Sequence, residues 1–246
     1  TLTKDQLNVL NEINKDLCSS NKMFRLLQGD VGSGKTIVSL LSAFNTINSG
    51  FQVAIMAPTE ILAKQHFILA KKIFPEKINI EFISGKTDYS SKKNILNKLE
   101  NNEINMIFGT HAIFQKKVTF KKLGLIIIDE QHKFGVNQRK KLSDKGGNNC
   151  DVLLMTATPI PRTLTMTLYG DMDISIIREK PKNRKPVKTY SKLESKIDEI
   201  IKFIKKEIKL GNQIFWVCPL IDESKKLDHS SAIKKYEFLK NKFPTN

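Results

Sequence analysis

A glycine-rich stretch near the N-terminus has the spacing of a phosphate-binding loop. The residues Gly29-Asp30-Val31-Gly32-Ser33-Gly34-Lys35-Thr36 match the pattern GxxxxGK[ST]. Glycine lets the backbone approach phosphate oxygens closely, so that successive N–H groups and a helix N-terminus face the anion. We expect Lys35 to reach the β- and γ-phosphates and the Thr36 hydroxyl to ligate Mg²⁺. The loop therefore predicts a site for a nucleoside triphosphate.

Two adjacent carboxylates, Asp129 and Glu130, follow the apolar run Leu125–Ile128. Ligands of parallel sheets bind at the carboxyl ends of the strands. We expect Asp129 to hold Mg²⁺, directly or through water, and Glu130 to orient and deprotonate the attacking water. An Asp-Glu pair after a strand is by itself commonly a solvated turn. Together with the phosphate loop it predicts a hydrolytic site in which Glu130 and Lys35 are catalytic.

The elements that would carry these residues alternate along the first part of the chain. The expected strands are almost wholly apolar, which is typical of strands covered on both faces. Strands alternating with helices predict an α/β fold with a parallel sheet and helices on each face. The expected strands are 24–28, 52–57, 78–83, 105–108, 125–128 and 152–155. The expected helices are 2–17, a helix after Lys35, 60–74, 90–99 and 161–168.

The composition changes after residue 177. Residues 178–186 are polar and interrupted by prolines, so we expect a linker there between a first domain, 1–177, and a second one, 187–246. In the second domain we expect a strand near Val187 and another over 213–217. The expected helices are 194–209 and 232–243.

Charge and cysteine content restrict the class of protein. The chain has 41 Lys+Arg against 25 Asp+Glu, a formal charge of +16. This excess favours a polyanionic partner such as nucleic acid, although a generally lysine-rich composition explains part of it. Three scattered cysteines exclude a disulfide framework and a cysteine-based zinc site. Without a long apolar run or an N-terminal signal, we expect a cytoplasmic protein.

Several further segments resemble the motifs of superfamily-two helicases. Asp129-Glu130-Gln131-His132 resembles motif II, and Thr156-Ala157-Thr158 resembles motif III, which couples hydrolysis to nucleic-acid binding in that superfamily. Gln6 lies where the superfamily has an adenine-reading glutamine. Segments 57–63 and 109–112 resemble motifs Ia and Ib, which contact the nucleic-acid backbone. The resemblance thus implies a coupling role for Gln131 and His132, and DNA contacts for Pro58, Thr59, Glu60, Gly109, Thr110, His111 and Arg162.

The longer strings are similar to the RecG-type DNA helicase family. They are GDVGSGKT, APTEILAKQH, GTHAIFQ, IIDEQHKFGVNQR and MTATPIPRTLTMTLYGD, and the resemblance covers nearly the whole chain. It implies a RecA-like motor lobe that uses ATP and Mg²⁺ to move on branched or duplex DNA in recombination and repair. The transcription-repair coupling factor shares the PIPRTL stretch, but it usually has Glu where this chain has Gln131.

Two other classes remain open beside the helicase interpretation. A phosphate-loop nucleotide kinase would need neither motif Ia nor motif Ib. A nucleotide-dependent DNA-binding module with negligible turnover is the second alternative. The RecG-type family also has an N-terminal wedge domain and a second lobe with motifs V and VI. We therefore expect the chain, which runs from Thr1 to Asn246, to be one complete lobe and the start of another within a longer protein.

Overall fold

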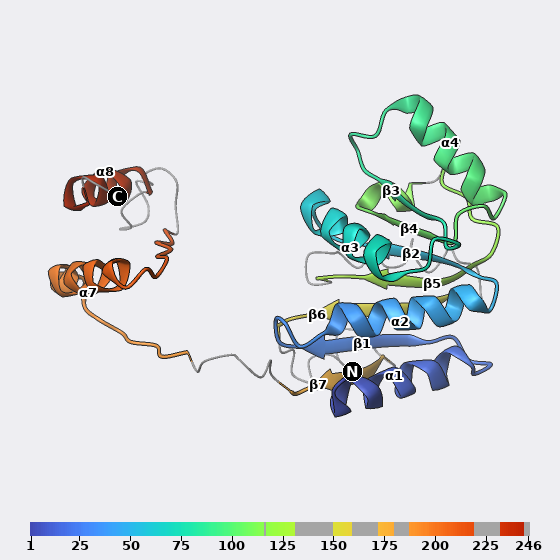
Figure 1. Ribbon diagram of the computed structural model, residues 1–246, viewed down its shortest axis with the longest axis horizontal. Helices are drawn as coiled ribbons and strands as arrows, with labels where there is room; N and C mark the ends of the chain where they lie inside the picture. Colours follow the sequence, from blue (N-terminus) through green and yellow to red (C-terminus); the bar gives the residue numbers. More distant parts are fainter. Residues whose placement is uncertain (116, 131–149, 159–171, 180–186, 219–231, 244–246) are drawn as a thin grey trace. The chain divides into compact units, whose positions relative to one another are not determined.

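The chain forms two compact units, Thr1–Arg184 and Lys185–Asn246. The computed structural model describes residues 1–115, 117–130, 150–158, 172–179, 187–218 and 232–243. The first unit contains a seven-stranded, all-parallel sheet in the order β3-β4-β2-β5-β6-β1-β7 (Figure 1). The strands are β1 Phe24–Gly29, β2 Gln52–Met56, β3 Ile80–Ile83, β4 Met106–Gly109, β5 Leu123–Ile128, β6 Asp151–Thr156 and β7 Asp173–Ile177.

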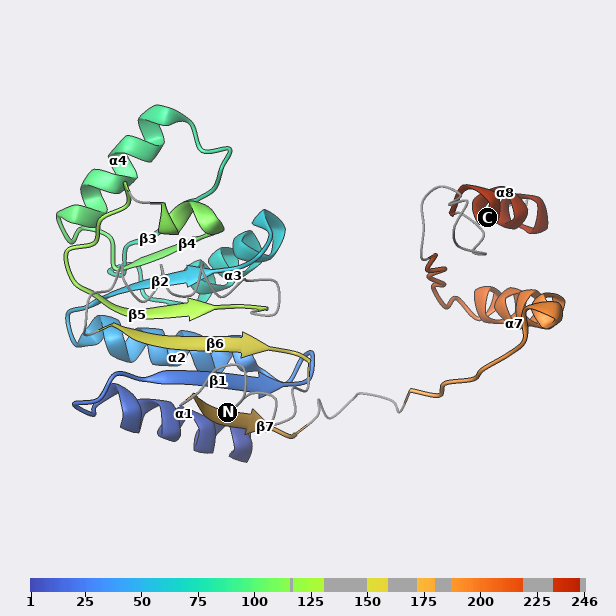
Figure 2. The same ribbon diagram turned by 180° about the vertical axis from the view of Figure 1, so that it is seen from behind.

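Helices pack on both faces of this sheet. They are α1 Lys4–Leu17, α2 Lys35–Asn48, α3 Glu60–Ile73 and α4 Tyr89–Glu100, with a short 3₁₀ helix η1 His111–Phe114. Helices α1, α2 and α3 lie together on one face, in front of the strands in Figure 1 and behind them in Figure 2. On the other face, Ile95 and Leu99 of α4 join the buried cluster around Ile107. Successive strand residues enter opposite clusters, which explains why the strands are apolar throughout.

The predicted α/β fold with a parallel sheet covered by helices on both faces is confirmed for the first unit, and so are six of its strands. Each of the six strands lies within a few residues of its expected bounds, and the expected first helix is α1, with Thr3 as its N-cap. The edge strand β7, which pairs with β1, was not predicted. Its burial alternates, with Ile176 exposed and Ile177 buried, so it lacks the continuous apolar signal of the central strands. The helix expected over 161–168 lies outside the described residues.

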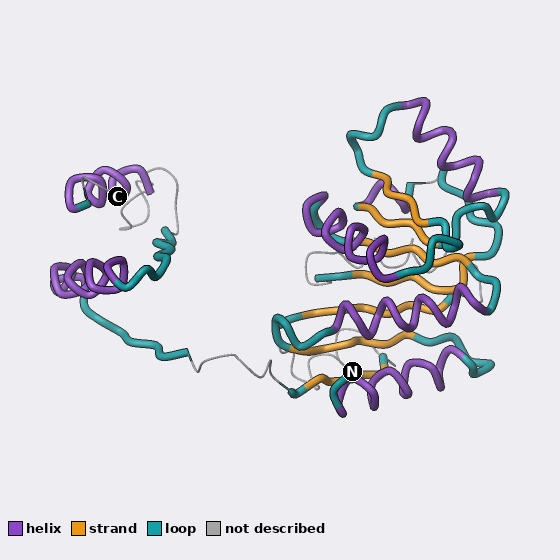
Figure 3. Tube along the Cα trace, in the orientation of Figure 1, coloured by secondary structure: helices purple, strands orange, loops and turns teal. Residues whose placement is uncertain are grey.

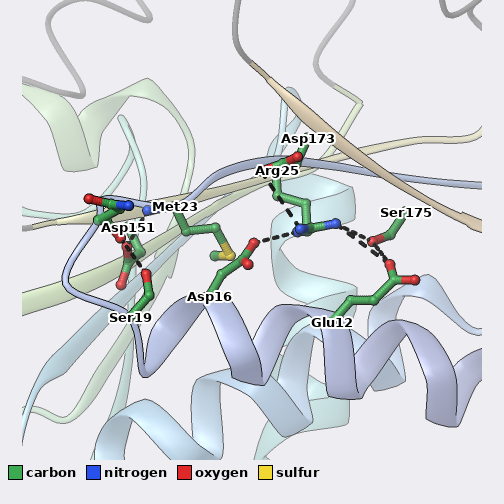
Figure 4. Close-up of polar contacts among 9 residues, drawn as sticks. Glu12, Asp16, Ser19, Met23, Arg25, Asp151, Asp173 and Ser175 are labelled. Carbon is green, nitrogen blue, oxygen red and sulfur yellow. Dashed lines mark hydrogen bonds and ion pairs between the residues drawn. The ribbon is translucent and has the colours of Figure 1, made fainter.

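A buried arginine fastens β7 and α1 to β1 (Figure 4). Arg25 on β1 is 8% exposed, and its Nε donates to Asp16 Oδ2 of α1 over 2.7 Å. Its Nη1 donates to Ser175 Oγ of β7 over 2.8 Å, while Glu12 and Asp173 lie 3.5 and 3.7 Å from the guanidinium. Because a buried charge is costly unless it is paired, this network fixes the edge strand through polar contacts rather than apolar ones.

The second unit contains the helices α7 Ile197–Lys209 and α8 Ala232–Lys242, with a 3₁₀ turn η4 Glu194–Lys196 before α7 (Figure 3). Both expected helices are confirmed. The strands expected near Val187 and over 213–217 are wrong, since residues 187–193 and 212–218 form neither helix nor strand. Val187, Phe215 and Val217 are more than 80% exposed. An apolar strand needs a paired neighbour and covered faces, and the described part of this unit contains no strand with which either segment could pair.

No helix in the described parts of the chain is long and apolar enough to cross a bilayer.

Candidate nucleotide-binding site

Five neighbouring strands place the predicted site segments along one edge of the sheet. In the register of the sheet, Met56 lies beside both Gly109 and Ile128, and Gln28 lies beside Thr156. Figure 2 shows the arrowheads of β5, β6 and β1 pointing the same way. Segments 109–111, 57–60, 129–130, 156–158 and 29–36 therefore follow one another along the carboxyl edge, where parallel sheets bind ligands.

The glycine-rich loop joins β1 to α2 as its sequence predicts. Gly29 ends β1, and α2 begins at Lys35. Gly32 and Gly34 have φ values of +80° and +91°, a region that only glycine adopts readily. A Cβ at Gly34 would also lie 2.3 Å from Gln6 Nε2. The loop can thus present its backbone N–H groups and the N-terminus of α2 to an anion.

Lys35 lies buried beneath this loop. Its Nζ donates to the carbonyl oxygen of Gly29 over 2.7 Å and to that of Asp30 over 3.1 Å. Burial lowers the pKa of Lys35, while the nearby carboxylates of Asp129, Glu130 and Asp30 act in the opposite direction. The lysine therefore lies within the electrostatic field of the Asp-Glu pair, and the two motifs converge although they are distant in the sequence.

The loop contains a buried hydroxyl without a partner. Ser33 is 4% exposed, and its Oγ accepts or donates no hydrogen bond among the described residues. A buried polar atom left unpaired costs about 1–3 kcal/mol, which a phosphate oxygen bound in the loop would relieve. The Thr36 hydroxyl and the Asp129 carboxylate supply the oxygen ligands that Mg²⁺ prefers. The residues present therefore fit ATP and Mg²⁺.

The Asp-Glu pair marks the point where β5 ends. Asp129 is 8% exposed, and its N–H donates to the carbonyl oxygen of Met56 over 2.8 Å, which holds its backbone in the sheet. The N–H of Glu130 donates to Asp129 Oδ1 over 3.0 Å. Glu130 has φ +52°, a left-handed conformation uncommon outside glycine. The chain thus leaves the strand direction immediately after Asp129.

His66 is a site residue that sequence reasoning missed. Its Nε2 lies 2.8 Å from Asp129 Oδ2, and both side chains are 12% exposed. The helix α3 carries it next to the sheet, because Ala63 and Ala70 are buried there and His66 lies between them at helical spacing. The signal in the sequence was a histidine on the apolar face of a helix that follows a strand adjacent to β5.

Gln6 lies against the phosphate loop. Its Nε2 donates to the carbonyl oxygen of Ser33 over 2.8 Å, and its Oε1 accepts from the N–H of Thr3 over 3.0 Å. The second bond belongs to a capping box at the start of α1. The adenine-reading role of Gln6 stays a prediction, and the structure adds a direct contact with the loop.

The segment that resembles motif III follows β6. Thr156 is buried, and its Oγ1 lies 2.8 Å from Thr158 Oγ1 and accepts from the N–H of Thr158 over 3.2 Å. Ala157 lies between them. Since β6 separates β5 from β1, these residues lie between the Asp-Glu pair and the phosphate loop. Gln131, His132 and Arg162, the other residues expected to couple hydrolysis or contact DNA, lie outside the described residues.

The segments that resemble motifs Ia and Ib lie side by side. The N–H of Ala57 donates to the carbonyl oxygen of Gly109 over 3.0 Å. Thr59 is exposed and caps α3, its Oγ1 accepting from the N–H of Leu62 over 3.3 Å. Thr110 precedes η1, which begins at the exposed His111.

Two other residues of these segments have structural neighbours. A Cβ at Gly109 would lie 2.1 Å from the carbonyl oxygen of Ile83, so the close approach of β3 and β4 already requires glycine there. Glu60 Oε2 lies 3.8 Å from Lys86 Nζ. Pro58 is half-buried just before the cap of α3. The DNA contacts expected of these residues stay predictions.

Comparison with known proteins identifies several relatives of the whole chain. The ATP-dependent DNA helicase RecG of Bacillus subtilis is 47% identical over 243 residues, which cover 98% of this chain and 36% of the relative. The RecG protein of Aquifex aeolicus is 47% identical over 99% of this chain and 31% of its own length. The chain therefore spans about a third of the length of these relatives.

Solved structures agree with the sequence relatives. A structure of RecG bound to a three-way DNA junction superposes with a TM-score of 0.80 at 38% identity, covering 98% of this chain and 31% of that one. The DEAD-box helicase Mss116 has a TM-score of 0.60 at 22% identity and shares the fold. The model of the DEAD/DEAH box helicase family matches residues 3–167, well over half of the chain. The chain belongs to the DEAD/DEAH box helicase family.

Proposed function

We propose that this chain is the ATP-binding motor part of a RecG-type ATP-dependent DNA helicase that acts on branched DNA. The observation that carries the proposal is the convergence of Lys35, Asp129 and Glu130 at the carboxyl edge of the sheet. The RecG relatives and the RecG complex with a three-way junction support the choice of substrate.

In this proposal the nucleotide is held by residues of the first unit. Residues 29–36 surround the phosphates, Lys35 compensates the charge on the β- and γ-phosphates, and Gln6 contacts the adenine. Thr36 and Asp129 would hold Mg²⁺, which would neutralise the charge that develops on the transferred phosphoryl group. Glu130 orients the attacking water and takes its proton.

DNA contacts in this proposal come from the neighbouring loops at the same edge. The two segments are joined where Ala57 bonds to Gly109. The residues that would follow a phosphate backbone are Pro58, Thr59, Glu60, Gly109, Thr110, His111 and Arg162. Backbone contacts carry little sequence information, which suits an enzyme that moves along any sequence. Residues 131–132 and 156–158 would transmit the state of the nucleotide to these loops.

The chain after the first unit is proposed to be a linker, 178–186, and part of a second RecA-like lobe, 187–246. The boundary between the two compact units, at Arg184, supports this division. A cytoplasmic location is part of the same proposal. It is supported by the three free cysteines Cys18, Cys150 and Cys218.

The proposal is tested by ATP hydrolysis with and without a three-way DNA junction. The measurement compares residues 1–246 with a chimera of Bacillus subtilis RecG in which they replace the matching part of that protein and keep its N-terminal and C-terminal parts. We expect the junction to stimulate hydrolysis by the chimera more than linear duplex DNA does. Hydrolysis by the chimera that no DNA stimulates would contradict a helicase motor, and equal stimulation by both forms of DNA would contradict the preference for branched DNA.

A further inference from the structure

The contact between His66 and Asp129 joins two elements that are distant in the sequence. His66 lies on α3, and Asp129 follows the strand β5. The Nε2 to Oδ2 distance of 2.8 Å is that of a charge-assisted hydrogen bond, and both side chains are nearly buried. An ionised carboxylate only accepts hydrogen bonds, so the imidazole must carry its proton on Nε2 and donate it.

This bond completes the orientation of the Asp129 carboxylate. The backbone of Asp129 is already fixed, because its N–H is bonded to the carbonyl oxygen of Met56. The N–H of Glu130 holds Oδ1, and His66 holds Oδ2. Among the described residues each oxygen thus has one side-chain or backbone donor, so the plane of the carboxylate is set from two sides.

The helix that carries His66 is itself firmly attached to the sheet. Ala63 and Ala70 are fully buried, which lets α3 approach the strands closely. Phe67, the next residue after His66, packs against Phe82 and Phe108 with ring centroids 5.7 and 6.1 Å apart. His66 therefore donates its hydrogen bond from a rigid position, as a residue that orients a ligand group must.

The geometry points to His66 as a positioning residue that holds the Asp129 carboxylate in the orientation from which it takes the Mg²⁺ of bound Mg·ATP. This inference rests on the proposed function, since it requires Asp129 to be the Mg²⁺ ligand. Hydrogen-bond partners of ligating groups commonly change metal affinity by about 10- to 100-fold when they are removed. His66 acts on Mg²⁺ affinity, whereas in this proposal the phosphate loop and Gln6 set the affinity for nucleotide without metal.

Two variants of similar length separate the hydrogen bond from the packing. His66→Gln keeps an N–H donor at the end of the side chain, and His66→Met has none. The measurement is the Mg²⁺ concentration that gives half-maximal binding of a fluorescent, non-hydrolysable ATP analogue, together with the affinity for the same analogue in EDTA. Ile68→Ala is the control, since Ile68 lies on the same helix and is 58% exposed.

We expect His66→Met to raise the Mg²⁺ midpoint roughly tenfold or more and His66→Gln to stay within about threefold of the parent chain. Affinity in EDTA should stay unchanged in both variants and in the control. Equal midpoints for the Met and Gln variants would overturn the inference. An affinity loss in EDTA as large as that with Mg²⁺ would also overturn it, because it would show damage to the nucleotide pocket.

Two further readings keep the outcome decisive. If His66→Met is less stable, the Mg²⁺ midpoint is obtained instead from thermal unfolding. The rise in melting temperature that the analogue causes is then measured at each Mg²⁺ concentration. A parent chain that binds no analogue at any Mg²⁺ concentration would contradict the proposed function itself. A parent chain that binds it, with a Met variant that has the same midpoint, would contradict the role of His66 alone.

Discussion

Gln6 on the first helix donates a hydrogen bond to the carbonyl oxygen of Ser33 in the phosphate loop over 2.8 Å. The residue before it, Asp5, accepts from the backbone N–H groups of Arg178 and Glu179 over 2.9 and 3.2 Å. The first turn of α1 thus contacts both the phosphate loop and the residues that follow the edge strand β7.

Gln6→Ala should weaken ATP binding and reduce the preference for ATP over GTP. The substitution removes the contact with Ser33, worth about 0.5–1.5 kcal/mol, and with it the amide that we expect to read adenine. Competition of ATP and GTP against a fluorescent analogue measures both effects. Asn8→Ala on the exposed side of α1 is the control. Unchanged ATP affinity with unchanged discrimination would refute both roles of Gln6.

Lys35→Ala should weaken nucleotide binding and abolish ATP turnover. Lys35 is the cation in the loop that compensates the β- and γ-phosphate charge, and its substitution should leave less than about a tenth of the rate. Steady-state hydrolysis by the RecG chimera measures this, with Lys15→Ala on α1 as a control for the loss of a positive charge. A variant that keeps its rate would contradict the assignment of the phosphate loop.

Glu130→Gln should separate binding from chemistry. It keeps the size of the side chain and leaves Asp129 in place, but it removes the base. ATP should therefore bind with nearly parental affinity while hydrolysis falls roughly 10²- to 10⁴-fold. Equilibrium binding and single-turnover hydrolysis give the two values. A loss of binding as large as that of Lys35→Ala would mean that the two residues do not have separate roles.

The sequence predicted those elements whose signal lies within the element itself, such as a continuous apolar run or a motif of fixed spacing. The central strands are apolar along their whole length because both of their faces are covered, and the phosphate loop has a fixed spacing. The edge strand β7 gave no such signal, since it is held by the polar network around Arg25. The segment 213–217, apolar from Ile214 onward, did resemble a strand, but a strand forms only where a neighbour pairs with it.

The residues of the candidate site likewise differ in whether their signal lies within one segment of the sequence. Lys35, Asp129 and Glu130 were found because each belongs to a motif with a known spacing. His66 was missed because its role depends on which strand lies beside the helix that carries it. That information comes from the strand order β2-β5, which periodicity along the chain does not contain.

Arg25→Met should destabilise the first unit without changing its nucleotide site directly. It removes a buried guanidinium that bonds Asp16 and Ser175 and lies beside Glu12 and Asp173. Because these carboxylates are partly exposed, we expect a loss of about 2–3 kcal/mol in the free energy of unfolding. Urea unfolding measures it, with the exposed Lys4→Met as control. A loss no larger than that of the control would mean that the network does not hold β7.

Residues 1–246 alone should bind Mg·ATP but hydrolyse it slowly, with little stimulation by DNA. Charge on the γ-phosphoryl group in the transition state is normally met by an arginine from a facing element, worth about 10³- to 10⁵-fold in rate. In the family that the chain resembles, this arginine lies in the second lobe, and within residues 1–246 the last arginine is Arg184.

The RecG chimera described above supplies both the missing arginine and further strands, so it should gain DNA-stimulated turnover. The apolar run Ile214–Val217, which is largely exposed and pairs with no strand in the described part of the chain, should then become protected from hydrogen exchange. Parallel measurement of hydrolysis and exchange on the two proteins tests both expectations. Vigorous DNA-stimulated hydrolysis by residues 1–246 alone would mean that an arginine of this chain, or of a second copy, completes the site, and the division into lobes would have to be redrawn.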